Sequence, residues 1–489
     1  MRTLQTLIKN VVVVRPDGSP DGDELDIGIT DGRFTRLELD IRPEEAETVV
    51  DGRGLLAFPG AVDAHQHWGI YNSLAEDAAS ESRACVQGGV TTALNYMRTG
   101  QYYLNRGGPY AEFFPMVLEQ ARDHSLVDYA FHLAPMTRQH IDEIPSLVED
   151  HGVTSFKIFM FYGGYGLHGR SADQSQFLMT PPDERYDLAH FEFVMRGVQA
   201  AREKFGDKAD HISLSLHCET AEIMTAYTRL VEQEGALRGL AAYSASRPPH
   251  SEALAVTTAA FLADETRLPN INLLHLSSAK ALRAAMLMAA TFEHVDFRRE
   301  VTIGHLLADV ENAHGLGGKV NPPLRPPADR ESLWEHVLAG NVDWVASDHA
   351  CCRDEKKFGD PRTDVFAAKS GFGGAEYLLP GLIGEGGRRG LSYQQIARLT
   401  AWNPAQRYGL LTKGTIGVGY DADFCLVDPA RSWTVHADDS RSTQEYTPFE
   451  GFELGARVTD TWVRGHRVLA DGNVTGTPHG RYVHRPQKR

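Results

Sequence analysis

Hydrophobic and polar positions divide the chain of 489 residues into a long alternating middle and two strand-rich ends. In the middle, short apolar runs typical of buried parallel strands alternate with helical patterns, as at residues 192–205 and 279–292. Eight such runs occur, at residues 57–65, 89–97, 129–135, 153–160, 212–218, 271–277, 301–307 and 342–348. Eight strand–helix units predict an α/β fold, a closed (β/α)8 TIM barrel. A doubly wound open sheet is the alternative, but no GxGxxG motif follows the first run.

The two ends of the chain share a different pattern, in which short apolar runs are separated by turn residues. Residues 11–14 are all valine, and turn sequences follow at residues 16–18, 31–32 and 51–52. Residues 410–475 repeat this rhythm. We therefore expect residues 1–56 and 410–489 to form one small β-sandwich domain, and residues 57–409 to form the barrel.

Side chains that suit metal ions stand at the ends of five of the apolar runs. They are His65, His67, Lys157, His217, His275 and Asp348. The first two are two residues apart, so on a strand both imidazoles point the same way and can meet one ion. A parallel barrel places its catalytic residues at the C-terminal ends of its strands. The pattern therefore predicts that the five segments meet in one metal site.

Lys157 is the unusual member of this set, because it lies in the otherwise apolar sequence SFKIFMF. Burial favours the neutral amine, which can react with carbon dioxide to give a carbamate whose two oxygens bridge two metal ions. The alternative is a lysine that extends its amine from a strand end into water.

Asp348 ends the eighth run and is expected to bind a metal and to take a proton from metal-bound water, whose pKa coordination lowers to about 7. His349 follows it on the strand and should point away, so we do not expect it to be a ligand. For His217 and His275 the alternative is a structural role as hydrogen-bonded core histidines.

Composition narrows the function classes. The net charge of −16 argues against a nucleic-acid surface and gives no reason to expect binding to anionic membranes. No apolar run approaches 18 residues and the N-terminus lacks a secretory pattern, so we expect a cytoplasmic protein that spans no membrane. The five cysteines form no disulfide framework, and the adjacent pair Cys351-Cys352 lacks CxxC spacing.

These motifs resemble those of the amidohydrolase superfamily, and within it the hydantoinase/dihydropyrimidinase branch of cyclic amidases. The similar segments are PGAVDAHQH, GVTSFKIFMFY, HCE, HLSS and ASDHA in the barrel, and KGTIGVGYDADFCLVDP and RGHRVLADG near the end of the chain. The resemblance covers nearly the whole chain. It implies a metal-dependent hydrolase that opens a cyclic amide, a small-molecule substrate, and a homotetramer.

The resemblance also implies a ligand set. His65, His67 and Asp348 would hold one ion, His217 and His275 the other, and N6-carboxylated Lys157 would bridge them. Zinc is the expected metal, and manganese or cobalt could substitute. A hydroxide between the metals would attack the amide carbon, and Asp348 would pass its proton to the leaving nitrogen.

Substrate contacts follow from the same resemblance. Tyr162 stands where the hydantoinase branch has a tyrosine that stabilises the oxyanion, which is a catalytic role. Asn321 opens the sequence NPPLR, which is similar to the family's substrate loop. Ser370 and Gly371 fall where a further backbone contact with the cyclic amide is expected.

Because of three departures from the family pattern, the sequence does not identify which ring is the substrate. Asn321 replaces the serine usual in the hydantoinase branch and is more like dihydroorotases and allantoinases. Ser370 replaces an expected asparagine. Gly69 stands two residues after HxH, where dihydroorotases carry an arginine, which argues against a dihydroorotase. An allantoinase-like or linear-amide hydrolase is therefore the alternative function, and a non-catalytic scaffold of the same fold is a third.

Two loops offer further candidates for substrate contact. The long loop of residues 163–187 contains Tyr165, His168 and Arg170. The loop after the second run contains Tyr102, Tyr103 and Arg106. A solvated or oligomer-facing role is the alternative for both loops.

Overall fold

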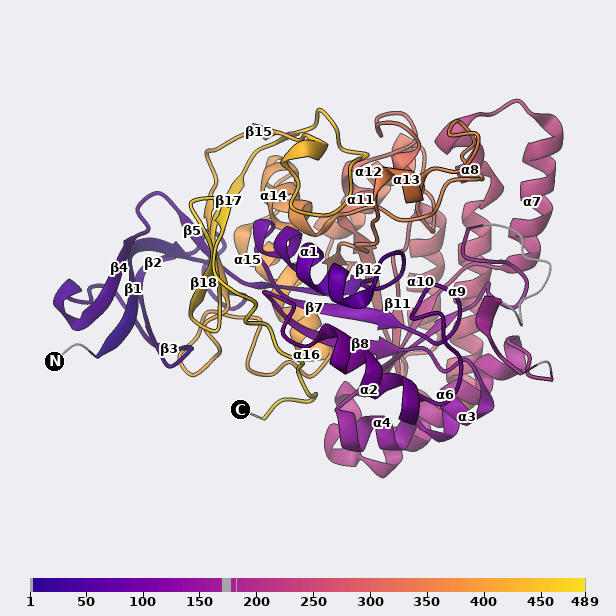
Figure 1. Ribbon diagram of the computed structural model, residues 1–489, viewed down its shortest axis with the longest axis horizontal. Coiled ribbons are helices and arrows are strands. Elements are labelled where there is room, and N and C mark those ends of the chain that lie inside the picture. Colours follow the sequence, from indigo (N-terminus) through magenta and orange to yellow (C-terminus); the bar gives the residue numbers. More distant parts are fainter. Residues whose placement is uncertain (1–2, 169–176, 182, 489) are drawn as a thin grey trace.

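The computed structural model describes residues 3–168, 177–181 and 183–488, and its centre is a barrel of eight parallel strands (Figure 1). In order around the barrel these are β6 (Ala61–Gln66), β7 (Val90–Met97), β8 (Asp128–Leu133), β9 (Ser155–Phe159), β10 (Ser213–His217), β11 (Asn270–Leu273), β12 (Asp296–Thr302) and β13 (Trp344–Ala346). The last strand meets the first: the His67 N–H donates to the His349 carbonyl at 2.9 Å, and Gln66 bridges to His349 in parallel. The predicted TIM barrel is therefore confirmed.

Helices cover the outside of the barrel (Figure 1). Every residue of β7, β9 and β10 is buried, as expected for parallel strands enclosed by helices. The helices are α1 (Leu74–Gln87), α2 (Tyr110–Ala121), α3 (Arg138–Asp142), α4 (Ile144–His151), α6 (Leu188–Lys204), α7 (Ala221–Glu234), α8 (Gly239–Ser246), α9 (Pro249–Thr266), α10 (Ala279–Thr291), α11 (Ile303–Leu307), α12 (Pro327–Leu338), α13 (Asp354–Lys357), α14 (Leu378–Gly381), α15 (Tyr393–Ala397) and α16 (Asn403–Arg407).

The seventh strand lies earlier than the hydrophobic pattern predicts. The apolar run at residues 301–307 contributes only its first two residues to β12, and its remainder forms the short helix α11. Thr302 begins that helix, because its side chain accepts a hydrogen bond from the His305 N–H. Charged residues conceal the true strand in the sequence, and two of them, Arg298 and Arg299, pair with Asp343 at 3.1 Å.

The two ends of the chain share a second sheet of nine strands beside the barrel (Figure 1). Its strands are β1 (Leu4–Val13), β2 (Asp23–Thr30), β3 (Arg33–Glu38), β4 (Ala46–Asp51), β5 (Leu56–Pro59), β14 (Phe424–Asp428), β17 (Arg457–Val463), β18 (His466–Ala470) and β19 (Asn473–Val474). β5 joins the two ends, since it pairs in parallel with β1 and antiparallel with β14. The additional domain built from both ends is as expected, while its predicted boundaries at residues 57 and 410 stay a prediction.

A buried ion cluster connects the N-terminal end of a barrel strand to this sheet. Lys413 Nζ lies 2.8 Å from Asp128, the first residue of β8, and 2.5 Å from Asp423, which precedes β14. Arg464, between β17 and β18, also pairs with Asp128. The cluster is therefore a charged joint between the two parts of the molecule. Among the described residues, no helix is long and apolar enough to cross a membrane.

Candidate metal centre

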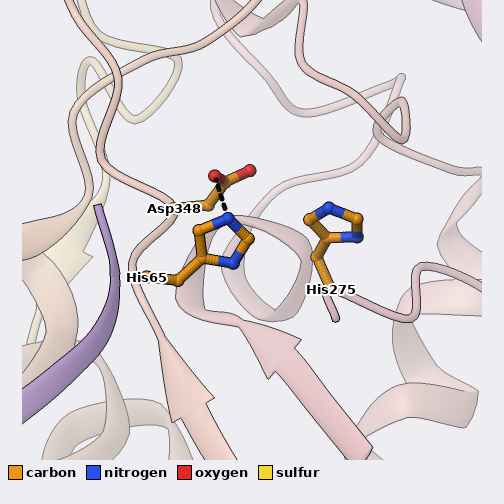
Figure 2. A group of neighbouring side chains, drawn as sticks. All are labelled: His65, His275 and Asp348. Atoms are coloured by element: carbon orange, nitrogen blue, oxygen red, sulfur yellow. Dashed lines mark ion pairs between the residues drawn. The ribbon is translucent and has the colours of Figure 1, made fainter. Parts of the chain in front are cut away.

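Three of the predicted ligand atoms converge at the mouth of the barrel. His65 Nε2 lies 3.2 Å from both His67 Nε2 and Asp348 Oδ1, and His67 Nε2 lies 3.3 Å from the same carboxylate oxygen. Two tetrahedral ligands at the usual zinc–nitrogen distance lie roughly 3.3 Å apart, so these separations fit one shared ion. The pairing of His65, from β6, with Asp348, from the segment after β13, is drawn in Figure 2.

The other two histidines lie against this group from β10 and the segment after β11. The rings of His217 and His275 are 4.3 Å apart between centroids, and the ligand atoms of His65, His275 and Asp348 all lie within 4.8 Å of one another (Figure 2). His275 Nδ1 is buried and has no hydrogen-bond partner within the described part of the chain. A buried polar atom left unpaired costs about 1–3 kcal/mol, so this nitrogen is suited to a metal ion.

Lys157 lies among these groups from β9. Its Nζ is 3.3 Å from His65 Nε2 and 3.8 Å from the centroid of the Tyr96 ring. Burial lowers the pKa of this amine to about 7, with only partial compensation from Asp348 and Glu300. The neutral amine is therefore well populated at neutral pH, and it is the form that reacts with carbon dioxide.

The protonation states of the remaining groups suit metal binding. Burial lowers the pKa of His217 to about 4 and lowers those of His65, His67 and His275 well below the usual value, so all four imidazoles are neutral. Neutral imidazole is the form that binds metals. Burial also raises the pKa of Asp348 to about 7, which means that its charge lacks a sufficient partner within the protein.

Three buried residues outside the predicted ligand set fix the orientation of the histidines; one of them, Tyr103, was expected as a candidate for substrate contact. Glu300 Oε1 lies 2.7 Å from His65 Nδ1, Glu219 Oε2 lies 2.6 Å from His217 Nε2, and the Tyr103 hydroxyl lies 2.8 Å from His67 Nδ1. Hydrogen bonds to the second ring nitrogen are the usual means of orienting a metal-binding histidine. Glu219 stands in the HCE segment, so its closeness to His217 in the sequence is the one signal that could have indicated its role. Glu300 lies in the strand that the hydrophobic pattern did not predict.

A cavity opens next to these groups and brings in the predicted substrate residues. Tyr162, Asn321, Ser370 and Gly371 line it together with five of the predicted ligands, which are His67, Lys157, His217, His275 and Asp348. Tyr162 stacks on Phe159 with ring centroids 4.5 Å apart, and burial raises the pKa of its hydroxyl, so the phenol keeps its proton. It is therefore able to donate a hydrogen bond into the cavity.

The side chain of Asn321 is held by neighbouring loops. Its Nδ2 donates to the Leu167 carbonyl at 2.7 Å, and its Oδ1 accepts from the hydroxyls of Tyr243 and Ser370. The Ser370 N–H donates to His168 Nδ1 at 3.1 Å. The side chain of Asn321 thus connects the segments that contain Leu167, Tyr243 and Ser370, so the expected contact with the substrate would be made by its backbone.

The loop candidates divide into those near the cavity and those away from it. Tyr103 lines the cavity, and His168 supports its rim through Ser370. Tyr165 is buried, and its hydroxyl lies 3.0 Å from that of Thr228. Tyr102 packs edge-on against His168, and exposed Arg106 pairs with Glu112. Arg170 lies outside the described residues.

Comparisons with known proteins agree with this geometry. Residues 376–469 match the sequence model of the Amidohydrolase family. The chain is 34% identical to an allantoinase of Rubrobacter xylanophilus over 95% of this chain and 94% of that protein. It is 27% identical to a D-phenylhydantoinase of Escherichia coli over 99% and 98% of the two chains. Its fold superposes on a D-hydantoinase (dihydropyrimidinase) from Thermus sp. with a TM-score of 0.82, 26% identity, and coverage of 98% and 99%.

Proposed function

We propose that the ring opened by this chain is a five-membered ureide such as allantoin. The chain belongs to the amidohydrolase family and hydrolyses the C–N bond of a cyclic amide with the help of metal ions. The observation that carries this choice is the 34% identity to an allantoinase over 95% of the chain. Asn321 in place of serine at the start of NPPLR agrees with it. Hydantoin, another five-membered ring, is the second candidate, because D-phenylhydantoinases and hydantoinases are similar over nearly the full length.

We assign the ligands as follows. His65, His67 and Asp348 would hold one ion and His217 and His275 a second, as the converging atoms and the unpaired His275 Nδ1 support. Zinc suits this set of imidazole and carboxylate donors. When bound, such ions polarise the amide carbonyl and lower the pKa of a water molecule.

Lys157 would bridge the two ions after carboxylation. The lone pair of the neutral amine attacks the carbon of carbon dioxide, a nitrogen–carbon bond forms, and the nitrogen loses one proton to solvent. The product is a carbamate anion with two oxygens, which replaces an amine whose charged form burial disfavours.

Asp348 and Tyr162 would carry the proton and the charge of the reaction. Asp348 takes a proton from the attacking water and gives it to the ring nitrogen as the carbon–nitrogen bond breaks, so the product is an open chain with a new carboxylate. Tyr162 donates a hydrogen bond to the carbonyl oxygen as negative charge develops there. Its place in the cavity lining, with a proton retained by burial, supports this role.

Metal analysis combined with ring-opening assays tests the proposal. Purified protein should contain about two metal ions per chain and should open allantoin faster than hydantoin or dihydrouracil. Turnover of hydantoin alone would contradict the proposal that the substrate is allantoin. Absence of bound metal after reconstitution with zinc and bicarbonate would contradict the ligand assignment. Sedimentation or light scattering would check the proposed homotetramer, and cell fractionation the proposed cytoplasmic location.

A further inference from the structure

A chain of buried hydrogen bonds runs from the metal centre to Asn321 in the cavity lining. His217 Nε2 lies 2.6 Å from Glu219 Oε2, and Glu219 accepts from both Nε and Nη2 of Arg247, the former at 2.9 Å. Nη1 of Arg247 lies 3.2 Å from the hydroxyl of Tyr243, which in turn donates to Asn321 Oδ1. All five side chains are buried, so water does not compete for these bonds.

The direction of every bond in the chain is fixed by chemistry. A guanidinium can only donate, so the Tyr243 oxygen accepts from Arg247 and its proton goes to Asn321. A carboxylate can only accept, so the Glu219 contact places a proton on His217 Nε2 and leaves Nδ1 with its lone pair. The Arg247 guanidinium binds both oxygens of Glu219, which fixes the carboxylate that contacts His217.

We propose that Arg247 is a positioning residue that couples the orientation of His217 to the position of the substrate loop at residues 321–325. Nε and Nη2 of its guanidinium bind Glu219, and Nη1 binds the hydroxyl of Tyr243. The inference rests on the proposed function, because it takes His217 as a metal ligand. It implies that metal binding and loop order depend on each other.

Arginine is required at this position because two of its nitrogens bind Glu219 and the third binds Tyr243. A lysine offers a single ammonium and cannot bind Glu219 through two bonds while reaching the Tyr243 hydroxyl. The guanidinium also lies among the rings of Phe161, Tyr165 and Tyr243, at 5.3, 5.6 and 5.7 Å from their centroids. Its position is therefore fixed by packing as well as by hydrogen bonds.

Tyr243→Phe tests the coupling, because it removes the hydroxyl that joins the two ends and leaves the Arg247–Glu219 pair intact. Hydrogen exchange of the peptide covering residues 319–325 is measured in the metal-loaded protein and after chelation. In the wild type, metal removal should speed exchange of this peptide. In Tyr243→Phe the exchange should be fast in both states, and KM should rise about fivefold to tenfold while kcat changes less than about twofold.

Tyr165→Phe is the matched control. Tyr165 is also buried beside Arg247, but its hydroxyl lies against Thr228 and not on the hydrogen-bond chain. This variant should keep the metal-dependent exchange and the KM of the wild type. Arg247→Lys should affect both ends: zinc per chain after dialysis should fall, and KM should rise.

The outcomes separate this inference from the proposed function. A wild type that binds no metal and opens no ring overturns both. A wild type that binds two metals and opens a ring, together with a Tyr243→Phe variant whose loop still responds to metal removal as the wild type does, overturns the coupling alone.

Discussion

Lys157 and Lys413 are both 1% exposed and lie near opposite ends of the barrel, yet the pKa values of their amines are shifted in opposite directions. Lys413 has three carboxylates within 3.4 Å, and they raise the pKa of its amine above the usual value although burial opposes this. Lys157 forms no ion pair with any described residue, and burial lowers the pKa of its amine to about 7. The first lysine is stabilised as a cation, and the second is not.

This difference distinguishes a structural from a chemical use of burial. The charges of Lys413, Asp128 and Asp423 satisfy one another and join the barrel to the terminal sheet. At the other end, the raised pKa of Asp348, the lowered pKa of Lys157 and the unpaired Nδ1 of His275 all indicate groups whose partners are not supplied by the protein. Metal ions and a carboxylated lysine would satisfy these groups.

Lys157→Met should have the largest effect on catalysis and little effect on the fold. With no bridging carbamate, kcat/KM for the ring substrate should fall by at least about 10³-fold. The melting temperature of the metal-free protein should stay the same or rise, because a poorly solvated amine is replaced by an apolar side chain. Assays and calorimetry on the same preparation check both halves. A melting temperature that drops with activity would mean that Lys157 is structural.

Lys413→Met should show the reverse. Removing the cation leaves the buried carboxylate of Asp423 without a cation and that of Asp128 with Arg464 alone, which costs about 3–5 kcal/mol. The melting temperature should fall by roughly 5 °C or more, while kcat per folded molecule stays close to that of the wild type. The double variant Lys413→Met/Asp423→Asn should recover part of the loss, because one unpaired charge is gone. Full stability in the single variant would contradict the account of this cluster.

The effect of Tyr162→Phe on catalysis should lie between those of Lys157→Met and Lys413→Met. It keeps the ring that stacks on Phe159 and removes one hydroxyl from the cavity wall. If that hydroxyl stabilises the oxyanion, kcat should fall by about 10²-fold with KM nearly unchanged. Tyr165→Phe, the loss of a hydroxyl bonded away from the cavity, is the control and should leave kcat unchanged. Equal losses in both variants would remove Tyr162 from the proposed catalytic groups.

The fold and the predicted ligands follow from local patterns, because apolar runs mark buried strands and polar residues at their ends mark the barrel mouth. What the sequence did not provide are the partners that come from other strands. Glu300 orients His65 across 235 positions, and its strand is obscured by arginines that pair with Asp343. Arg247 meets Glu219 only because α8 ends over the barrel mouth. Such contacts depend on tertiary packing, which a local pattern does not encode.

The smallest expected difference between the two lysine sites is in how the melting temperature depends on acid. It is measured in metal-free protein, so that loss of metal plays no part. Burial by itself would raise the pKa of Asp128, but Lys413 and Arg464 outweigh it and hold the pKa below its usual range. A depressed pKa contributes stability that is fully present above the unfolded value, about 3.9, and is lost as pH falls through the folded value.

The pKa of Asp423 is instead raised, chiefly by burial, so its protonation adds no loss as pH falls. The melting temperature of the wild type should therefore change little through this cluster down to about pH 4 and decline below it. In Lys413→Met, Asp128 loses one of its two cations, so its folded-state pKa rises towards the unfolded value and the decline of the melting temperature below about pH 4 should become smaller. Lys157→Met should follow the wild-type curve, because Lys157 forms no ion pair with Asp128. Parallel curves for all three proteins would show that the charges of the joint contribute nothing to acid stability.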